Sequence, residues 1–221
     1  MAPKKLIILV EGDSELRFIK TQVIPFLYAR STGLWSIDTC KIISNRQLNK
    51  KGGNISYEYL NNDIHKFVKN GYNVITTFLD FFRLPSNFPG YTTDGSMIDQ
   101  IESAMVVDFK SWNSSLSELI PYIQKYEFEA LLFSSMDGFE YLLDDDKRLS
   151  QIRSIINSFA TPEEINGGPS TAPSKRLANI FNYNKVADSS DVLEIIGIDV
   201  IRARCPRFSQ WLDKLTKVVV E

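Results

Sequence analysis

Histidine is almost absent from this chain, since His65 is the only one among 221 residues. An enzyme built on a Ser-His-Asp or Cys-His arrangement, or a histidine-based nuclease, would have to use this residue. His65 lies between Asp63 and Phe67 in a stretch that predicts an amphipathic helix, with no nucleophile or orienting partner near it in the sequence. We therefore interpret His65 as a helix-surface residue.

Cysteine is nearly as scarce, with only Cys40 and Cys205. Two thiols this far apart, outside any paired motif, indicate neither a disulfide framework nor a zinc site. We interpret both as small buried apolar residues.

Long hydrophobic runs are also missing. The first apolar run, residues 6–10, ends at Glu11 and is too short for the core of a signal peptide. No run approaches the length of a membrane span. We therefore expect a cytoplasmic protein with no membrane association.

Neither sign of charge is in large excess, because 25 Lys and Arg stand against 27 Asp and Glu, for a net charge of −2. The general basic field of many nucleic-acid-binding domains is thus absent. A phosphate-binding patch would have to be local, or cations would have to neutralise an acidic site. The length suits one large domain or two small ones.

What the sequence does have is an alternation of strand and helix patterns. Apolar and β-branched runs predict strands at residues 4–10, 41–44, 73–80 and 119–126. Helical spacing predicts helices after residue 14, at 57–70, 96–109, 137–143 and 149–159, from 174, and twice in the tail, the second at 207–217. This order predicts an α/β fold with a mostly parallel sheet flanked by helices. We expect a core at 1–145 and a helical extension at 146–221 packed on it, or one single domain.

Carboxylates stand where three of these strands should end. Glu11 follows the first strand, Asp80 ends the third, and Glu127 and Glu129 follow the fourth, while Glu15 can point back from the first turn of a helix. Sites in parallel α/β sheets form at the carboxyl ends of strands. Oxygen ligands of this kind suit Mg²⁺ or Mn²⁺, and two such ions can activate water and stabilise the leaving oxygen of a phosphodiester.

Each acid also has a plainer interpretation. An acid after a strand is commonly a helix cap or a solvated turn residue, Glu11 included. Asp80 is the stronger candidate, because an acid that closes an apolar strand is unusual. On a strand, Glu127 and Glu129 would face one side and repel each other unless a cation lay between them. Residues 130–134 fit a helix start and a strand end equally well.

Lys175 is the basic candidate, because it follows a loop rich in Gly, Pro, Ser and Thr at the start of a predicted helix, with Ser174 as the cap. It could hold a phosphate or stabilise charge in a transition state, and Arg176 could add a phosphate contact. The plainer interpretation is an exposed helix lysine. The loop lacks the glycine of a Walker A motif before its lysine, so we do not predict ATP hydrolysis.

These residues resemble the Toprim superfamily, which includes topoisomerases, primases and the nuclease domains of overcoming-lysogenization-defect (OLD) proteins. Residues 10–15 look like the OLD-type opening, in which both glutamates, here Glu11 and Glu15, bind metal. Asp80 looks like the first acid of the Asp-x-Asp pair, but Phe82 stands where the second should be, which leaves one metal site a ligand short unless Glu127 or Glu129 supplies it. The resemblance implies that these two glutamates are the later acidic pair and that Lys175 is the late catalytic lysine.

The whole chain, from Leu9 to Leu215, is also similar to an uncharacterised bacterial Toprim-like family. The matching strings are Gly52-Gly53 with Ser56-Tyr57, Leu84-Pro85, Phe88-Pro89-Gly90, residues 127–133, Glu164-Ile165-Asn166, residues 171–177, Ile201-Arg202 and Cys205-Pro206. The resemblance implies a role in antiviral defence, a nucleic acid substrate and an ABC- or AAA-type ATPase partner, and it leaves a homo-oligomer open.

Three functions compete on this basis. The first is an Mg²⁺- or Mn²⁺-dependent nuclease acting on DNA or RNA, with Glu11, Glu15, Asp80, Glu127 and Glu129 as metal ligands and Lys175 and Arg176 as phosphate contacts. The second is an inactive regulatory module of an ATPase complex, which Phe82 and the acidic composition favour. The third, a small-molecule phosphotransferase, ranks last because the chain has no nucleotide loop.

Overall fold

The computed structural model describes residues 2–45, 50–51, 55–165, 168 and 170–221. Gly52, Gly53, Asn166, Gly167 and Pro169, which belong to the strings and loops singled out in the sequence, lie outside the described residues. The chain divides into two compact units, the first made of residues 1–123 and 214–221 and the second of residues 124–213. These boundaries differ from the expected core at 1–145 and extension at 146–221, because the first unit ends at residue 123 and includes the last eight residues of the chain.

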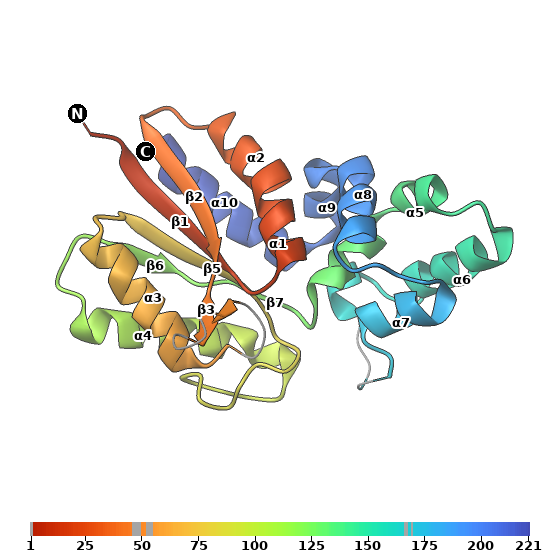
Figure 1. Cartoon of the computed structure of the whole chain (residues 1–221), viewed down its shortest axis with the longest axis horizontal. Coiled ribbons are helices and arrows are strands. Elements are labelled where there is room, and N and C mark those ends of the chain that lie inside the picture. The colour runs from red at the N-terminus through yellow and green to blue at the C-terminus, as the bar shows by residue number, and fades with distance from the viewer. Residues whose placement is uncertain (1, 46–49, 52–54, 166–167, 169) are drawn as a thin grey trace. The chain divides into compact units, whose positions relative to one another are not determined.

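The first unit is built on a mostly parallel sheet (Figure 1). Its strands are β1 (Lys4–Val10), β2 (Trp35–Lys41), β5 (Val74–Asp80) and β6 (Glu118–Ile120), in the order β2-β1-β5-β6, and β7 (Ile123–Gln124) also pairs with β5. β1 runs parallel to both β2 and β5, and β5 runs parallel to β6. The inner strands are buried along nearly their whole length, as the continuous apolar runs in their sequences predicted. The predicted α/β class is therefore confirmed, and the arrangement is consistent with a Toprim-like fold.

Helices connect these parallel strands. α1 (Asp13–Phe18), the π-helical segment η1 (Ile19–Val23) and α2 (Ile24–Tyr28) lead from β1 to β2. α3 (Tyr57–Lys69) precedes β5, and η2 (Gly95–Met97) with α4 (Ile98–Trp112) leads from β5 to β6. The connection from β1 leads to β2 at one edge of the sheet, whereas the connections from β2 to β5 and from β5 to β6 lead toward the other edge. Right-handed connections therefore place α1 and α2 on one face of the sheet and α3 and α4 on the other (Figure 1).

The second unit is helical over its described residues. It contains η3 (Phe128–Ser134), α5 (Asp137–Leu142), α6 (Asp146–Asn157), η4 (Pro162–Glu164), α7 (Pro173–Ile180), α8 (Ala187–Ile196) and α9 (Ile198–Arg204), and α10 (Pro206–Val220) begins in it. The buried carboxylate of Glu163 accepts the N–H groups of Arg207 and Phe208 at 2.9 Å each, in the first turn of α10. This side chain supplies acceptors that the start of a helix lacks.

Several sequence-based boundaries were wrong. The strand predicted at residues 41–44 is really the end of β2 and the start of β3 (Ile43–Asn45), a short strand antiparallel to β4 (Lys50–Lys51). β2 was missed because its sequence WSIDTCK mixes polar and apolar residues, and only its pairing with β1 makes it a strand. The strand predicted at 119–126 is the two short strands β6 and β7.

Two further corrections concern site residues. Glu127 and Glu129 do not lie on a strand, because Glu127 is the residue before the 3₁₀ helix η3 and Glu129 lies within it. Residues 130–134 continue that helix. α7 begins at Pro173 with Ala172 in the cap position, so Ser174 is not the cap. The tail holds three helices where two were expected.

None of the helices in the described part of the chain has both the length and the apolar character of a membrane span.

Candidate functional site

Glu11 and Asp80 follow two neighbouring strands to the same edge of the first unit's sheet. Val10 pairs with Phe78 in the parallel β1–β5 ladder, so Glu11 comes directly after β1 and Asp80 is the last residue of β5. Neighbouring strands lie about 4.8 Å apart, which brings these two positions close together. The sequence predicted both positions.

Glu15 lies four residues after Glu11, in the first turn of α1. Its side chain is buried, with 2% of the residue exposed, although it carries a carboxylate. A Cβ atom added to Gly12 would collide with Oε2 of Glu15. The backbone of Gly12 is extended, with φ −127°, a conformation open to any residue. The glycine at position 12 therefore leaves room for the Glu15 carboxylate. The backbone conformation of the turn does not itself require a glycine.

Lys41 adds a cation to the same edge of the sheet. It is the last residue of β2 and pairs with Val10, so the strand ends bring Lys41, Glu11 and Asp80 to consecutive strands. Its ammonium group lies 2.7 Å from Oδ1 of Asp13, the first residue of α1. No local sequence pattern marks Lys41, because only the pairing of β2 with β1 brings it to this edge.

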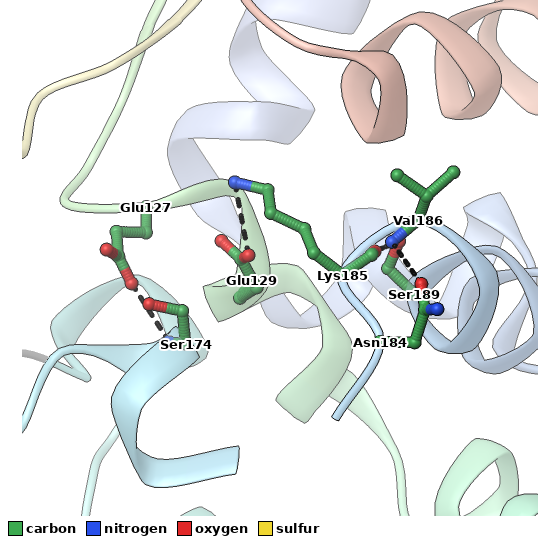
Figure 2. Close-up of polar contacts among 7 residues, drawn as sticks. All are labelled: Glu127, Glu129, Ser174, Asn184, Lys185, Val186 and Ser189. Atoms are coloured by element: carbon green, nitrogen blue, oxygen red, sulfur yellow. Dashed lines mark hydrogen bonds and ion pairs between the residues drawn. The ribbon is translucent and has the colours of Figure 1, made fainter. Parts of the chain in front are cut away.

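Glu127, in the second unit, is bound to the start of α7. Its Oε2 accepts the N–H of Ser174 at 2.9 Å (Figure 2). Ser174 lies in the first turn of α7, where unpaired N–H groups and the helix dipole favour a negative charge. The carboxylate therefore serves α7 as an acceptor from outside the helix.

Glu129 is fully buried and forms an ion pair with Lys185, whose Nζ lies 3.2 Å from Oε1 (Figure 2). The Lys185 side chain is 49% exposed, so the pair joins a buried carboxylate to a partly solvated cation. The loop that carries Lys185 is held locally: the side-chain oxygen of Asn184 accepts the N–H groups of Val186 and Ala187. The sequence analysis missed Lys185, and no local signal marks it, since it is a lysine in a polar loop.

Lys175 and Arg176 lie in the first turn of α7 but differ in their surroundings. Lys175 is exposed. The Arg176 Nε donates to the carbonyl oxygen of Thr171 at 2.7 Å, and its guanidinium group lies over the Phe159 ring, 5.4 Å from the centroid. Arg176 thus links Thr171 to Phe159 in the segment after α6, whereas Lys175 faces solvent.

Backbone strain accompanies both acidic segments. Among the described residues, the two that have a positive φ and are not glycine are Arg83 (φ 65°) and Tyr126 (φ 70°). Arg83 comes three residues after Asp80, and Tyr126 directly precedes Glu127. Such conformations cost free energy and cluster at functional sites.

The remaining rare residues have distinct environments. Burial raises the pKa of the Cys205 thiol, whose sulfur lies 3.4 Å from Oγ of Ser134, so Cys205 is unsuited to nucleophilic chemistry. Cys40 is only half-buried, so the expectation that both thiols are buried was wrong for Cys40. His65 lies on α3, as expected, but is half-buried and stacked on Trp112.

Within the described ranges, no three Asp, Glu, His or Cys side chains are gathered closely enough to hold a metal ion as they stand. The donor chemistry at the first unit's sheet edge is nevertheless of the kind that hard divalent cations take, because Glu11, Glu15 and Asp80 all offer carboxylate oxygens.

Comparisons with known proteins complete the description of the chain. No curated protein matches it, and no solved structure does. A family model described as a domain of unknown function (DUF4276) matches residues 10–216, which is nearly the whole chain. The chain therefore belongs to the DUF4276 family.

Proposed function

We propose that this protein is an Mg²⁺- or Mn²⁺-dependent nuclease, with Glu11, Glu15 and Asp80 as the metal-binding residues. The observation that carries the proposal is the convergence of Glu11 and Asp80 at the carboxyl ends of adjacent parallel strands, with the buried Glu15 four residues after Glu11 in the first turn of α1. A bound divalent cation would stabilise the charge of the buried Glu15 carboxylate, for which the glycine at position 12 leaves space. The resemblance to Toprim and OLD nuclease domains points to the same three residues.

A divalent cation bound by these carboxylates would activate water and stabilise the leaving oxygen of a phosphodiester. Lys41 would contribute a positive charge beside the phosphodiester. It lies on β2, one strand away from Glu11, and its ammonium group is held by Asp13. The positive φ of Arg83 supports the proposal, because strained backbone conformations cluster at functional sites and Arg83 lies three residues after Asp80.

Glu127 and Glu129, which the sequence offered as metal ligands, are left out of the proposed metal site. Glu127 is engaged by the Ser174 N–H and Glu129 by Lys185, so both carboxylates have partners within their own unit. We therefore rest the metal site on the first unit's residues alone. Lys175, exposed on α7, stays a proposed phosphate contact of the second unit. Arg176 is committed to Thr171 and Phe159 and is the weaker phosphate contact.

A second candidate function is a regulatory module without chemistry, working with an ATPase partner in antiviral defence. The observation that favours it is Phe82, an aromatic residue at the position where the resemblance would place a second acid. A phenylalanine offers no carboxylate oxygen to a metal ion, and the Arg83 guanidinium lies over its ring, 5.1 Å from the centroid. Homo-oligomerisation would be compatible with either function.

The test is an incubation of the purified protein with plasmid, single-stranded DNA and total tRNA, in Mn²⁺ and in EDTA. Glu11→Gln is the test variant. Glu118→Gln is the matched control, because Glu118 is an exposed glutamate at the opposite end of a strand in the same sheet. We expect metal-dependent cleavage that Glu11→Gln abolishes and Glu118→Gln retains.

Two results would contradict the nuclease. One is equal cleavage by a folded Glu11→Gln variant, which would remove Glu11 from the chemistry. The other is the absence of cleavage from the wild type both alone and together with a candidate ATPase, combined with no Mn²⁺ binding in calorimetry. That second result would favour the regulatory module.

A further inference from the structure

A hollow of about 640 Å³ lies on the first unit and is lined by residues of α3 and β3 and by Asn70, directly after α3. Its lining combines two lysines, a histidine and two asparagines with Ile43 and Asp63, and the residues are Ile43, Asn62, Asp63, His65, Lys66, Lys69 and Asn70. This volume lies within the range of small-molecule sites. The hollow is far richer in cationic and amide groups than an ordinary apolar pocket.

The lining carries two lysines and one acid, Asp63, so its formal charge is positive. Asp63 is the acid of the lining, but it is buried, and its Oδ2 accepts the N–H of Ile43 at 3.0 Å. Lys66 and Lys69 are exposed and lie three residues apart, which puts them on the same face of α3. A third cation lies at the rim, because the Lys5 Nζ is 3.5 Å from the carbonyl oxygen of Asn70.

Strand pairing brings further basic residues to this part of the unit. Ile43, which lines the hollow, pairs with Lys51, and Asn45 pairs with Lys50. The lysines give this part of the unit a positive charge, although the net charge of the whole chain is −2. Such a charge would attract a polyanion over about the Debye length of 10 Å.

The hollow also has aromatic and amide groups. The His65 ring stacks on the Trp112 indole, with centroids 3.5 Å apart and planes 24° apart, so the side chain is held in one orientation. Asn62 and Asn70 offer both donors and acceptors. Cations spaced along a helix beside a fixed ring and amides match the phosphates, bases and sugars of a nucleic acid strand.

From these observations we propose that the hollow on α3 binds the phosphodiester backbone of a nucleic acid strand, with Lys66 and Lys69 as its phosphate contacts. The inference rests on the proposed function in one respect, because it names the place where the first unit engages a nuclease substrate. Its residues are separate from the carboxylates of the sheet edge, so the two proposals can fail independently.

The test measures binding of fluorescein-labelled single-stranded DNA and RNA oligonucleotides by anisotropy in EDTA, so that metal-dependent cleavage cannot contribute. The test variant is Lys66→Ala/Lys69→Ala. The control is Lys214→Ala/Lys217→Ala, which removes two exposed lysines with the same spacing from α10. We expect the test variant to weaken binding on the order of tenfold and to make the slope of log K against log salt shallower by about 1.4, since each single-strand phosphate contact contributes about 0.7. The control should bind as the wild type does.

Equal affinity of the test variant and the control would overturn the proposal, as would the absence of oligonucleotide binding by the wild type. Competition by adenosine monophosphate or inorganic phosphate at the same concentration as an oligonucleotide would also overturn it, because the hollow would then hold a small phosphate ligand and not a strand. Retained binding by Glu11→Gln in EDTA, with its cleavage lost in Mn²⁺, would support both proposals. Cleavage by the wild type together with unchanged binding by the lysine variant would leave the nuclease standing and sink the α3 site.

Discussion

The carboxylate of Glu15 lies where a side chain on Gly12 would have to stand. Gly12 has an extended backbone, so the pair is matched by space and not by backbone conformation. This relationship links a glycine in the turn after β1 to the most buried acid of the candidate metal site.

We expect Gly12→Ala to move the Glu15 carboxylate and to leave the fold intact. The displaced atoms are the end of a flexible side chain, and alanine also reduces the entropy of the unfolded chain, so the change in unfolding free energy should stay within about 1 kcal/mol. Mn²⁺ affinity, measured by calorimetry, should fall at least about tenfold, which corresponds to about 1.4 kcal/mol. Gly33→Ala is the control, because a Cβ there meets Trp35 only at ordinary contact distance, 3.7 Å. Unchanged Mn²⁺ affinity in Gly12→Ala would remove Glu15 from the site.

Glu163 should be a strong stabilising residue of the second unit. Glu163→Ala leaves the N–H groups of Arg207 and Phe208 without their carboxylate acceptor, and we expect a loss of about 2–4 kcal/mol in unfolding free energy. Glu164→Ala is the matched control, since Glu164 is the exposed neighbour of Glu163. Urea unfolding of the two variants decides the matter. A loss of equal size in both would mean that the α10 contact contributes little.

The same carboxylate should give the protein a distinctive pH dependence. Burial raises the pKa of Glu163 above its usual 4.5, and the two N–H donors from α10 only partly oppose that rise. A raised pKa in the folded state means that the group's stabilising contribution is complete below pH 4.5 and is lost as the pH rises through the folded value. We therefore expect the wild type to lose stability relative to Glu163→Gln as the pH rises from about 4.5. Parallel stability profiles of the two proteins would contradict the raised pKa.

The Glu129–Lys185 pair should be coupled in stability. Removing the cation leaves a fully buried carboxylate without its ion-pair partner, which costs about 3–5 kcal/mol for a fully buried pair. Because the Lys185 side chain is 49% exposed, solvent reduces this, and we expect about 1–2 kcal/mol for Lys185→Met. Lys147→Met, an exposed lysine on α6, is the control. A double-mutant cycle with Glu129→Gln measures the coupling, and additive single-variant effects would show that the pair is not coupled.

The two thiols should react very differently with a thiol reagent. Cys40 is half-buried on β2, whereas Cys205 is fully buried and its pKa is raised by burial. We expect one thiol per chain to react in the native protein and the second only after unfolding, because labelling of Cys205 requires opening of the second unit. Cys40→Ser should abolish native labelling and Cys205→Ser should leave it unchanged. The reverse pattern would contradict the assignment.

Local sequence patterns predicted the strands and helices whose residues show a continuous apolar run or a helical spacing. The runs of β1 and β5 are apolar along their length because both strands are buried on two faces, and α3 shows the spacing of an amphipathic helix with Ser56 at its cap. The positions of Glu11 and Asp80 at strand ends followed from those runs. Residue order alone was therefore enough for the α/β class and for the positions of Glu11, Asp80 and, in the first turn of the next helix, Glu15.

The tertiary structure decided what depends on partners far along the chain. β2 is a strand because it pairs with β1, and that pairing brings Lys41 to the sheet edge. Glu129 forms an ion pair with Lys185, 56 positions later in the sequence, and Glu127 accepts the N–H of Ser174. A carboxylate's charge state and role depend on the donors and cations around it, and these come from segments that only folding brings together. The sequence by itself determined where the acids would stand on the first two buried strands, and the folded chain alone determined which groups meet them.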